Sequence, residues 1–437
     1  MKRRTVSRRT LVKAAGLGAL AAGAGAFARE QGQALARTAA VASSSASAAA
    51  DKGGARRVGL PETMKGLGDP VGASPYGRPS RHEADVVRRV IDWMNPTRES
   101  TVSFTPLHAL EGIITPNGLH FERHHAGAPD IAPEDHRLLV HGLVERPMVF
   151  SLEDLRRFPR QSRFHFLECA GNGALEWRAP QNNALQFTHG MIACCQWTGV
   201  RLMDVLEECG LKKDAAWLLC ESVDGAGYAR SLPLEKAREA LLVFAQNGEA
   251  LRPEQGYPLR LLCPGLEGAA SVKWLGRIEV GDAPWMTREE TARYSDLLPD
   301  GRARLFTLEM EVKSVITHPC PENPLRRKGP QQLSGLAWSG RGRIVAVDVS
   351  FDGGMNWQPA HLEEPVLPRC LTRFRLPFEW HGEERLLQSR AVDETGAVQP
   401  THAQNVADKG ETGIYHNNSI TTWQVMKDGT VRHVRLG

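Results

Sequence analysis

The pattern of apolar residues changes near Gly301, and this change limits the folds that the chain can adopt. Between about Arg137 and Pro284, short apolar runs mix with segments of helical spacing. After about Asp300, polar and apolar residues alternate in four segments that are separated by turn sequences such as Asp352-Gly353-Gly354. These segments are 309–316, 343–350, 374–378 and 385–392. The pattern predicts an α+β domain followed by a β-sandwich.

The length of the chain agrees with more than one domain. A single hydrophobic core rarely organises more than about 250 residues, and this chain has 437. We place the α+β domain at 82–300 and the sandwich at 301–437. Residues 29–81 are rich in Ala, Ser, Gly and Pro and contain few large apolar side chains. They are therefore predicted to form a linker and an extended arm.

Three local patterns in the α+β region predict individual elements. Residues 136–142 favour a strand that ends in a turn. Ser151 followed by Asp154 is typical of a helix start with a serine cap. Apolar residues at helical spacing over 199–210, with Gly210 at the end, predict a helix that stops at this glycine.

The N-terminus has the pattern of an export signal. Ser7-Arg8-Arg9-Thr10-Leu11-Val12-Lys13 precedes fifteen uncharged residues, 14–28, which end in a small-residue cleavage pattern. Fifteen residues are too few to span a bilayer, which takes about 20. The sequence predicts a twin-arginine signal peptide over 1–28 and a periplasmic protein without a membrane span. A basic N-terminal helix is the alternative. The twin-arginine route commonly serves proteins that receive a cofactor before export.

The overall charge argues against nucleic acid as a partner. The net charge is +4, and it becomes −2 when the six basic residues of the predicted signal are removed. A nucleic-acid binder would keep a basic surplus on its folded part. The eight cysteines include no C-x-x-C or C-x-x-C-H pattern, which argues against zinc ribbons and covalent haem.

Cys169 lies where a predicted strand breaks into a glycine- and asparagine-rich turn, Phe166-Leu167-Glu168-Cys169-Ala170-Gly171-Asn172-Gly173. A thiolate in such a loop suits a soft, thiophilic metal, and the glycines let backbone N–H groups approach a ligand. The alternative is a small buried side chain with a structural role. Cys194 and Cys195 are interpreted as structural.

These motifs resemble the sulfite oxidase family of molybdopterin enzymes from about Phe121 to the C-terminus. Glu-Cys-Ala-Gly-Asn at 168–172 looks like the family's molybdenum-ligating loop. Arg-x-His at 123–125, Gly-Tyr-Pro-Leu-Arg at 256–260 and the stretch 264–275 resemble other family motifs. The resemblance implies a molybdopterin domain followed by an immunoglobulin-like β-sandwich that commonly dimerises.

The resemblance also implies a role for each matching residue. Cys169 would ligate molybdenum, Arg123 would bind substrate, and Tyr294 would be the active-site tyrosine. The residues implied to bind the molybdopterin cofactor are His125, Asp224, Arg260, Ser271 and Lys273. Buried cations such as Arg260 and Lys273 need an anionic partner, for which a cofactor phosphate and a carboxylate such as Glu267 are the alternatives. For the other two residues, the alternatives to a role in the active site are a surface tyrosine at Tyr294 and a core histidine at His125.

Three positions depart from typical sulfite oxidases. Gly173 and His416 stand where the family has active-site arginines, and Gln255 replaces a histidine. Fewer fixed cations would weaken the capture of a small dianion. We also expect a wider pocket, with His416 as a tunable catalytic cation. The pattern resembles the sulfane dehydrogenase branch of the family. It implies oxidation of sulfane sulfur on a carrier protein, and a homodimer within a heteromer that passes electrons to a c-type cytochrome subunit.

Three other functions stay open at this point. A sulfite:cytochrome c dehydrogenase would have the same fold and a smaller substrate. A molybdenum sulfoxide reductase would share the signal and the cysteine, but it usually lacks the Cys-Ala-Gly-Asn motif and the sandwich. An exported, non-catalytic binding or scaffold protein would contain no molybdenum.

Overall fold

The computed structural model describes residues 61–91, 97–178, 180, 184–411 and 413–436. The predicted signal peptide and most of the predicted linker lie outside these residues. The chain divides into two compact units, 1–82 and 83–437. In the first unit, residues 61–82 are exposed throughout and include the short 3-10 turn η1 (Glu62–Met64) and the start of a second, η2 (Arg81–Glu83).

The α+β part of the second unit is built on two five-stranded sheets. In one, with order β5-β4-β13-β8-β9, only β4 and β13 run parallel. In the other sheet, the strand order is β11-β10-β7-β6, and β12 also pairs with β10. The strands are β4 (Leu138–Gly142), β5 (Met148–Phe150), β6 (Arg160–Glu168), β7 (Ile192–Arg201), β8 (Trp217–Ser222), β9 (Ala229–Pro233), β10 (Leu241–Gln246), β11 (Glu249–Ala250), β12 (Arg260–Leu262) and β13 (Leu275–Gly281).

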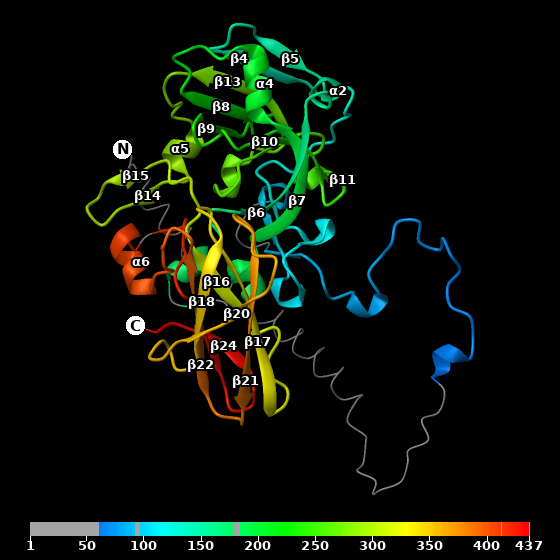
Figure 1. Cartoon of the computed structure of the whole chain (residues 1–437), viewed down its shortest axis with the longest axis vertical. Coiled ribbons are helices and arrows are strands. Elements are labelled where there is room, and N and C mark those ends of the chain that lie inside the picture. Colours follow the sequence, from blue (N-terminus) through cyan, green and yellow to red (C-terminus); the bar gives the residue numbers. More distant parts are fainter. Residues whose placement is uncertain (1–60, 92–96, 179, 181–183, 412, 437) are drawn as a thin grey trace, which may run out of the picture. The chain divides into compact units, whose positions relative to one another are not determined.

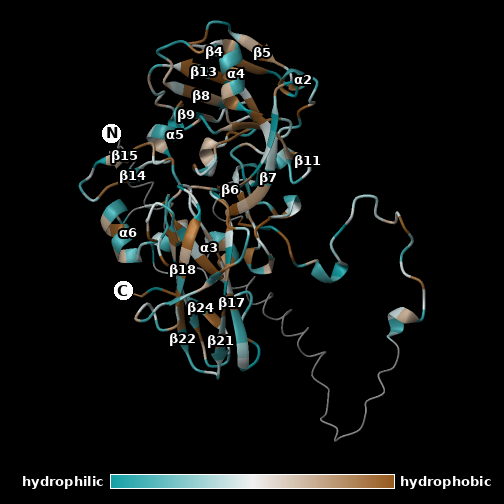
Figure 2. Ribbon diagram, in the orientation of Figure 1, coloured by the Kyte–Doolittle hydropathy of each residue, from teal (hydrophilic) through white to brown (hydrophobic). Residues whose placement is uncertain are grey.

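Short elements complete this part. A three-stranded sheet comprises β1 (Arg89–Val90), β2 (Val102–Phe104) and β3 (Glu122–Arg123), and a two-stranded ribbon comprises β14 (Asp296–Leu297) and β15 (Ala303–Arg304). The helices are α2 (Leu152–Leu155), α3 (Leu185–His189), α4 (Leu202–Cys209) and α5 (Arg288–Ala292). Figure 2 shows hydrophobic residues along β7, β8 and β13, as expected for strands whose side chains are largely buried.

Two of the local predictions are confirmed and one needs correction. Strand β4 forms over 138–142 of the predicted segment 136–142. The Ser151 side chain accepts a hydrogen bond from the backbone of Asp154 in a complete capping box. The predicted helix over 199–210 begins too early. Residues 199–201 instead finish β7, because Val200 is fully buried in the sheet, while α4 ends before Gly210 with φ 74° as predicted.

The second part is a sandwich of two antiparallel sheets, with orders β16-β17-β21-β20 and β19-β18-β22-β23-β24 (Figure 1). The strands are β16 (Lys313–His318), β17 (Gly329–Trp338), β18 (Ile344–Ser350), β19 (Gln358–Pro359), β20 (His361–Leu362), β21 (Thr372–Trp380), β22 (Arg385–Asp393), β23 (Thr422–Val425) and β24 (Val431–Val434). Helix α6 (His402–Lys409) precedes β23. The four predicted segments correspond to β16, β18, β21 and β22.

The two parts of this unit share a hydrophobic core. Phe166 of β6 and Ile192 and Cys194 of β7 are buried in the same cluster as Trp338 and Trp423 of the sandwich. No helix in the described part of the chain is long and apolar enough to cross a membrane.

Candidate active site

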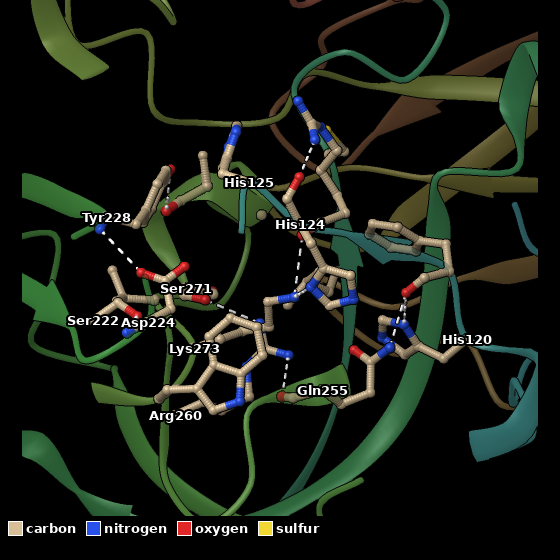
Figure 3. A pocket seen from close by; sticks show the side chains of 18 of the residues that line it. His120, His124, His125, Ser222, Asp224, Tyr228, Gln255, Arg260, Ser271 and Lys273 are labelled. Carbon is tan, nitrogen blue, oxygen red and sulfur yellow. Dashed lines mark hydrogen bonds between the residues drawn. The ribbon is translucent and has the colours of Figure 1, made fainter. Parts of the chain in front are cut away.

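Eight of the nine site residues predicted from the sequence line a single pocket (Figure 3). They come from β3, the loop after β6, the β8–β9 turn, β12, the segment before β13 and the segment after α5. They are Arg123, His125, Cys169, Asp224, Arg260, Ser271, Lys273 and Tyr294. His416 is the ninth and is not among the lining residues.

Cys169 lies at the start of a tight loop that follows β6. Its N–H donates to the carbonyl of Met191 at 3.0 Å, and its carbonyl accepts from the N–H of Asn172 at 2.8 Å. Burial raises the pKa of the thiol, while the N–H of Gly171 acts to lower it. Of the eight cysteines, Cys169 is the one that is not fully buried. A ligand can therefore reach this sulfur from the pocket.

The surroundings of Cys169 contain no complete protein-built metal site. Among the described residues, no group of three or more His, Cys, Asp or Glu side chains could hold a metal ion. A metal bound by Cys169 must therefore bring its other ligands with it. A metal carried by a sulfur-donating organic cofactor meets that requirement, because thiolate is a soft ligand that leaves the remaining positions to the cofactor.

Arg260 is a buried cation that donates to backbone carbonyls and whose guanidinium lies over the ring of Trp197, 5.3 Å from the ring centroid. Its guanidinium donates to the carbonyls of Gln255 at 3.0 Å and Ser271 at 2.9 Å, and the side chain is 2% exposed. Within the described residues, no carboxylate forms an ion pair with it. Burial lowers its pKa to about 10. A buried and uncompensated charge of this kind is stabilised by an anionic ligand, such as a phosphate.

Lys273 is a second cation without a carboxylate partner in the described part of the chain. Its Nζ lies 2.9 Å from Nδ1 of His124 (Figure 3). It also donates to the carbonyls of Arg123 and Glu254, both at 3.1 Å. Burial, with the nearby charge of Arg260, lowers the pKa of its ammonium well below the usual value. The alternative partner Glu267 contacts neither cation. The two cations therefore fit an anionic cofactor.

The β8–β9 turn contributes a second wall to the pocket. The ring of His125 stacks on that of Tyr228, with centroids 5.5 Å apart and planes at 9°. Burial and the nearby arginines lower the pKa of His125 to about 3, so it is neutral. The Asp224 carboxylate accepts from the N–H of Tyr228 at 3.3 Å.

The Ser271 hydroxyl accepts from the N–H of Cys263 at 3.0 Å, which fixes the 263–271 turn.

Tyr294 is buried rather than on the surface. Its backbone is left-handed, with φ 36°, and its side chain is 9% exposed. The ring packs against the guanidinium of Arg230 at 4.6 Å and lies 5.1 Å from the ring of Tyr415. Burial and the neighbouring Tyr228 raise the pKa of its phenol well above the usual value. Tyr294 is therefore a neutral hydrogen-bonding group at the pocket.

His416 lies outside the lining residues, and both of its ring nitrogens are occupied. Nδ1 lies 3.0 Å from the carboxylate of Asp296, and Nε2 lies 3.2 Å from that of Glu267. Burial opposes its charge, but the two carboxylates prevail and raise the pKa of His416 to about 9. His416 is thus a cation whose charge is compensated by neighbouring carboxylates. In this arrangement it is not available as a tunable cation for a substrate.

The sequence did not reveal the ion network to which His416 belongs. Arg230 pairs with Glu267 at 2.6 Å and with Glu290 at 2.8 Å, and all three side chains are about 1% exposed. The network therefore runs from Glu290 through Arg230, Glu267 and His416 to Asp296. The sign of this network in the sequence is Arg230, which lies in the apolar run of β9. A buried arginine of this kind needs an anionic partner.

The other two departures from the family pattern occupy different places. Gln255 lines the pocket and donates to the carbonyl of Phe121 at 2.9 Å. Gly173 does not line it, and a Cβ at this position would lie 3.1 Å from Nζ of Lys313. Gly173 is therefore packed against the sandwich residue Lys313, and the wider pocket expected from the sequence stays a prediction.

Comparison with protein families identifies both parts of the second unit. Residues 125–288 match the family model of the oxidoreductase molybdopterin binding domain, and residues 304–422 match that of the Mo-co oxidoreductase dimerisation domain. The predicted order of a molybdopterin domain and a β-sandwich is confirmed. The sequence-predicted residues around Cys169, Arg260 and Lys273 lie in the first of these matches.

Individual relatives agree with this assignment. The chain is 34% identical to mitochondrial sulfite oxidase of Mus musculus over 72% of its own length and 62% of the relative's. It is 34% identical to sulfite oxidase of Gallus gallus over 66% of its own length and 69% of that protein. The chain thus spans somewhat less than two thirds of the mouse relative.

A solved structure is more similar still. The crystal structure of the sulfane dehydrogenase SoxCD from Paracoccus pantotrophus matches with a TM-score of 0.85 and 49% identity, covering 86% of this chain and 98% of the matched chain. The fold, the motifs and these relatives together show that the chain belongs to the sulfite oxidase family of molybdopterin oxidoreductases.

Proposed function

We propose that the chain is the molybdenum subunit of a sulfane dehydrogenase, and that it oxidises sulfane sulfur held on a carrier protein. The observation that carries this proposal is the 49% identity to a chain of the sulfane dehydrogenase SoxCD from Paracoccus pantotrophus, 98% of which is covered. The arrangement of cations supports it. Of the three lining residues Arg123, Arg260 and Lys273, the last two suit the cofactor, which leaves Arg123 for the substrate.

The residues of the pocket divide into cofactor-holding and substrate-facing groups. Cys169 would supply a thiolate to molybdenum, while Arg260 and Lys273 would hold the anionic part of the cofactor, with His125, Asp224 and Ser271 along it. When bound, the cofactor supplies two-electron redox chemistry at sulfur.

On the substrate side, Arg123 would orient an anionic sulfur group. Its guanidinium already donates to backbone carbonyls of Thr101 and His124, which fixes its direction. The Tyr294 phenol would donate a hydrogen bond and hold a proton near the reacting sulfur. Burial among Tyr228, Arg230 and Tyr415 keeps that phenol in one place and in its protonated form.

Electrons would leave through a c-type cytochrome on a separate chain. The sequence has no C-x-x-C-H motif for covalent haem, which fits a c-type haem acceptor supplied by a partner. We further propose that the subunit forms a homodimer through its dimerisation domain within a larger heteromer. Export to the periplasm by the twin-arginine route is proposed from residues 1–28 alone.

A sulfite:cytochrome c dehydrogenase is the second candidate, because the chain shares 34% identity with sulfite oxidases. The two are separated by turnover of the molybdenum-loaded protein with its cytochrome, using free sulfite and carrier-bound sulfane as alternative substrates. A higher kcat/KM for the carrier-bound sulfane supports the proposal, and a higher value for sulfite replaces it with the second candidate. A purified protein without molybdenum would instead indicate a non-catalytic binding or scaffold protein.

A further inference from the structure

The residue that precedes Cys169 is held mainly by the sandwich domain. The Glu168 carboxylate is fully buried and accepts three hydrogen bonds. One comes from Asn172 of the same loop, from Nδ2 at 2.9 Å. The other two come from the sandwich: Nε1 of Trp338 in β17 at 2.7 Å and Nζ of Lys313 in β16 at 3.3 Å.

Lys313 also holds the far end of the loop. Its Nζ donates to the carbonyl of Asn172 at 3.0 Å, and its side chain is 2% exposed. The ammonium can come this close because position 173 is a glycine. A Cβ on Gly173 would lie only 3.1 Å from Nζ. One buried lysine therefore contacts both the residue before Cys169 and the residues that close its turn.

The strand that leads into the loop is packed against the same domain. Phe166 of β6 lies in the hydrophobic cluster of the sandwich, and its N–H donates to the carbonyl of Arg369 at 2.9 Å. The strand end, the Glu168 side chain and the turn are thus all fixed by residues from beyond the molybdopterin domain. A reacting centre loses rate steeply when it is misplaced by about 1 Å, so such support matters for catalysis.

We propose that Lys313 and Trp338 are positioning residues for the metal-ligating loop, and that they act through the Glu168 carboxylate. The sandwich then has a second role besides dimerisation, because it completes the support of the active site in its own chain. This inference depends on Cys169 as the metal ligand, and it is independent of which sulfur compound is the substrate.

The test compares two tryptophans of the sandwich. Trp338→Phe keeps most of the aromatic volume and removes the hydrogen bond to Glu168. Trp423→Phe is the matched control, because Trp423 is equally buried and its Nε1 donates to the carbonyl of Ile316 at 3.0 Å rather than to Glu168. We expect Trp338→Phe to lower kcat about tenfold with KM unchanged, since a hydrogen bond to a charged group is lost. Trp423→Phe should keep the wild-type kcat.

Two readouts do not depend on turnover. The first is the visible absorption of the loaded protein, in which the thiolate-to-metal band should shift in Trp338→Phe and stay unchanged in Trp423→Phe. The second is alkylation of Cys169 by iodoacetamide in the full-length, molybdenum-free chain, followed by mass spectrometry. We expect the alkylation rate to rise about tenfold in Trp338→Phe only. A protein that fails to oxidise sulfane would leave both readouts intact.

A charge-rescue pair covers the case in which a lysine variant folds poorly. Lys313→Met leaves the buried Glu168 carboxylate without its ion-pair partner. Adding Glu168→Gln removes that uncompensated charge and keeps the side-chain shape. The double variant should therefore recover soluble yield and slow the alkylation of Cys169 relative to Lys313→Met alone. Equal absorption and alkylation in the two tryptophan variants, or no recovery in the double variant, would overturn the proposal.

Discussion

The ionisation of His416 predicts a pH-dependent contribution to folding stability. Both ring nitrogens face carboxylates, Asp296 at 3.0 Å and Glu267 at 3.2 Å, and the residue is 5% exposed. These partners raise its pKa from 6.5 to about 9. Since one pKa unit corresponds to about 1.4 kcal/mol, the charged histidine contributes about 3 kcal/mol to the free energy of unfolding.

The sign of this effect follows from the direction of the pKa shift. Because the folded protein holds the proton more tightly than the unfolded chain, the contribution is complete below pH 6.5. It is lost as the pH rises through about 9. His416→Asn removes the titrating group, and asparagine tolerates the left-handed backbone at this position, where φ is 56°.

The measurement is urea unfolding followed by tryptophan fluorescence, for the wild type and His416→Asn at intervals from pH 6 to pH 10. The variant should be less stable by about 3 kcal/mol at pH 6, and the difference should shrink steadily above pH 6.5. Stabilities that run parallel across the whole range would refute the assignment of His416 as a buried, carboxylate-bound cation.

Three further substitutions test the pocket and the loop. Arg260→Met should abolish cofactor retention, measured as molybdenum per chain. Because the substitution removes an unpaired buried charge, the molybdenum-free variant should unfold at a urea concentration no lower than that of the molybdenum-free wild type. Tyr294→Phe should lower kcat about a hundredfold without changing the thermal midpoint, as expected for the loss of a proton-handling group; an unchanged kcat would exclude that role. Gly173→Ala should destabilise the protein by about 1–2 kcal/mol in urea unfolding, because φ is 85° and Lys313 lies close, and wild-type stability would contradict this.

The residues of the pocket could be predicted from the sequence where a local motif by itself indicated a bound ligand. Cys169 in a glycine-rich turn and Arg260 in an apolar run each demanded a ligand, and both line the pocket. The capping box at Ser151 was equally readable, because it depends on residues three apart. The start of α4 was misplaced because residues 199–201 carry the same apolar pattern whether they end a strand or begin a helix.

The sequence could not show which charges meet across the fold. Glu267 was considered as a partner for Arg260 or Lys273, but it pairs with Arg230 and His416 instead. The family pattern placed His416 at the position of an active-site arginine, but it did not reveal the carboxylates around the imidazole. Lys313 was read only as part of a strand, since its partner Glu168 lies 145 residues away. Such contacts depend on tertiary packing, which local patterns do not encode.

The central claim is that Cys169 supplies the protein's ligand to molybdenum, and X-ray absorption at the molybdenum edge tests it most directly. The number of sulfur neighbours of the metal would be compared in the wild type, Cys169→Ser and the control Cys195→Ser, which alters a fully buried cysteine. We predict one sulfur neighbour fewer in Cys169→Ser and no change in the control. An unchanged sulfur count in Cys169→Ser would contradict the account.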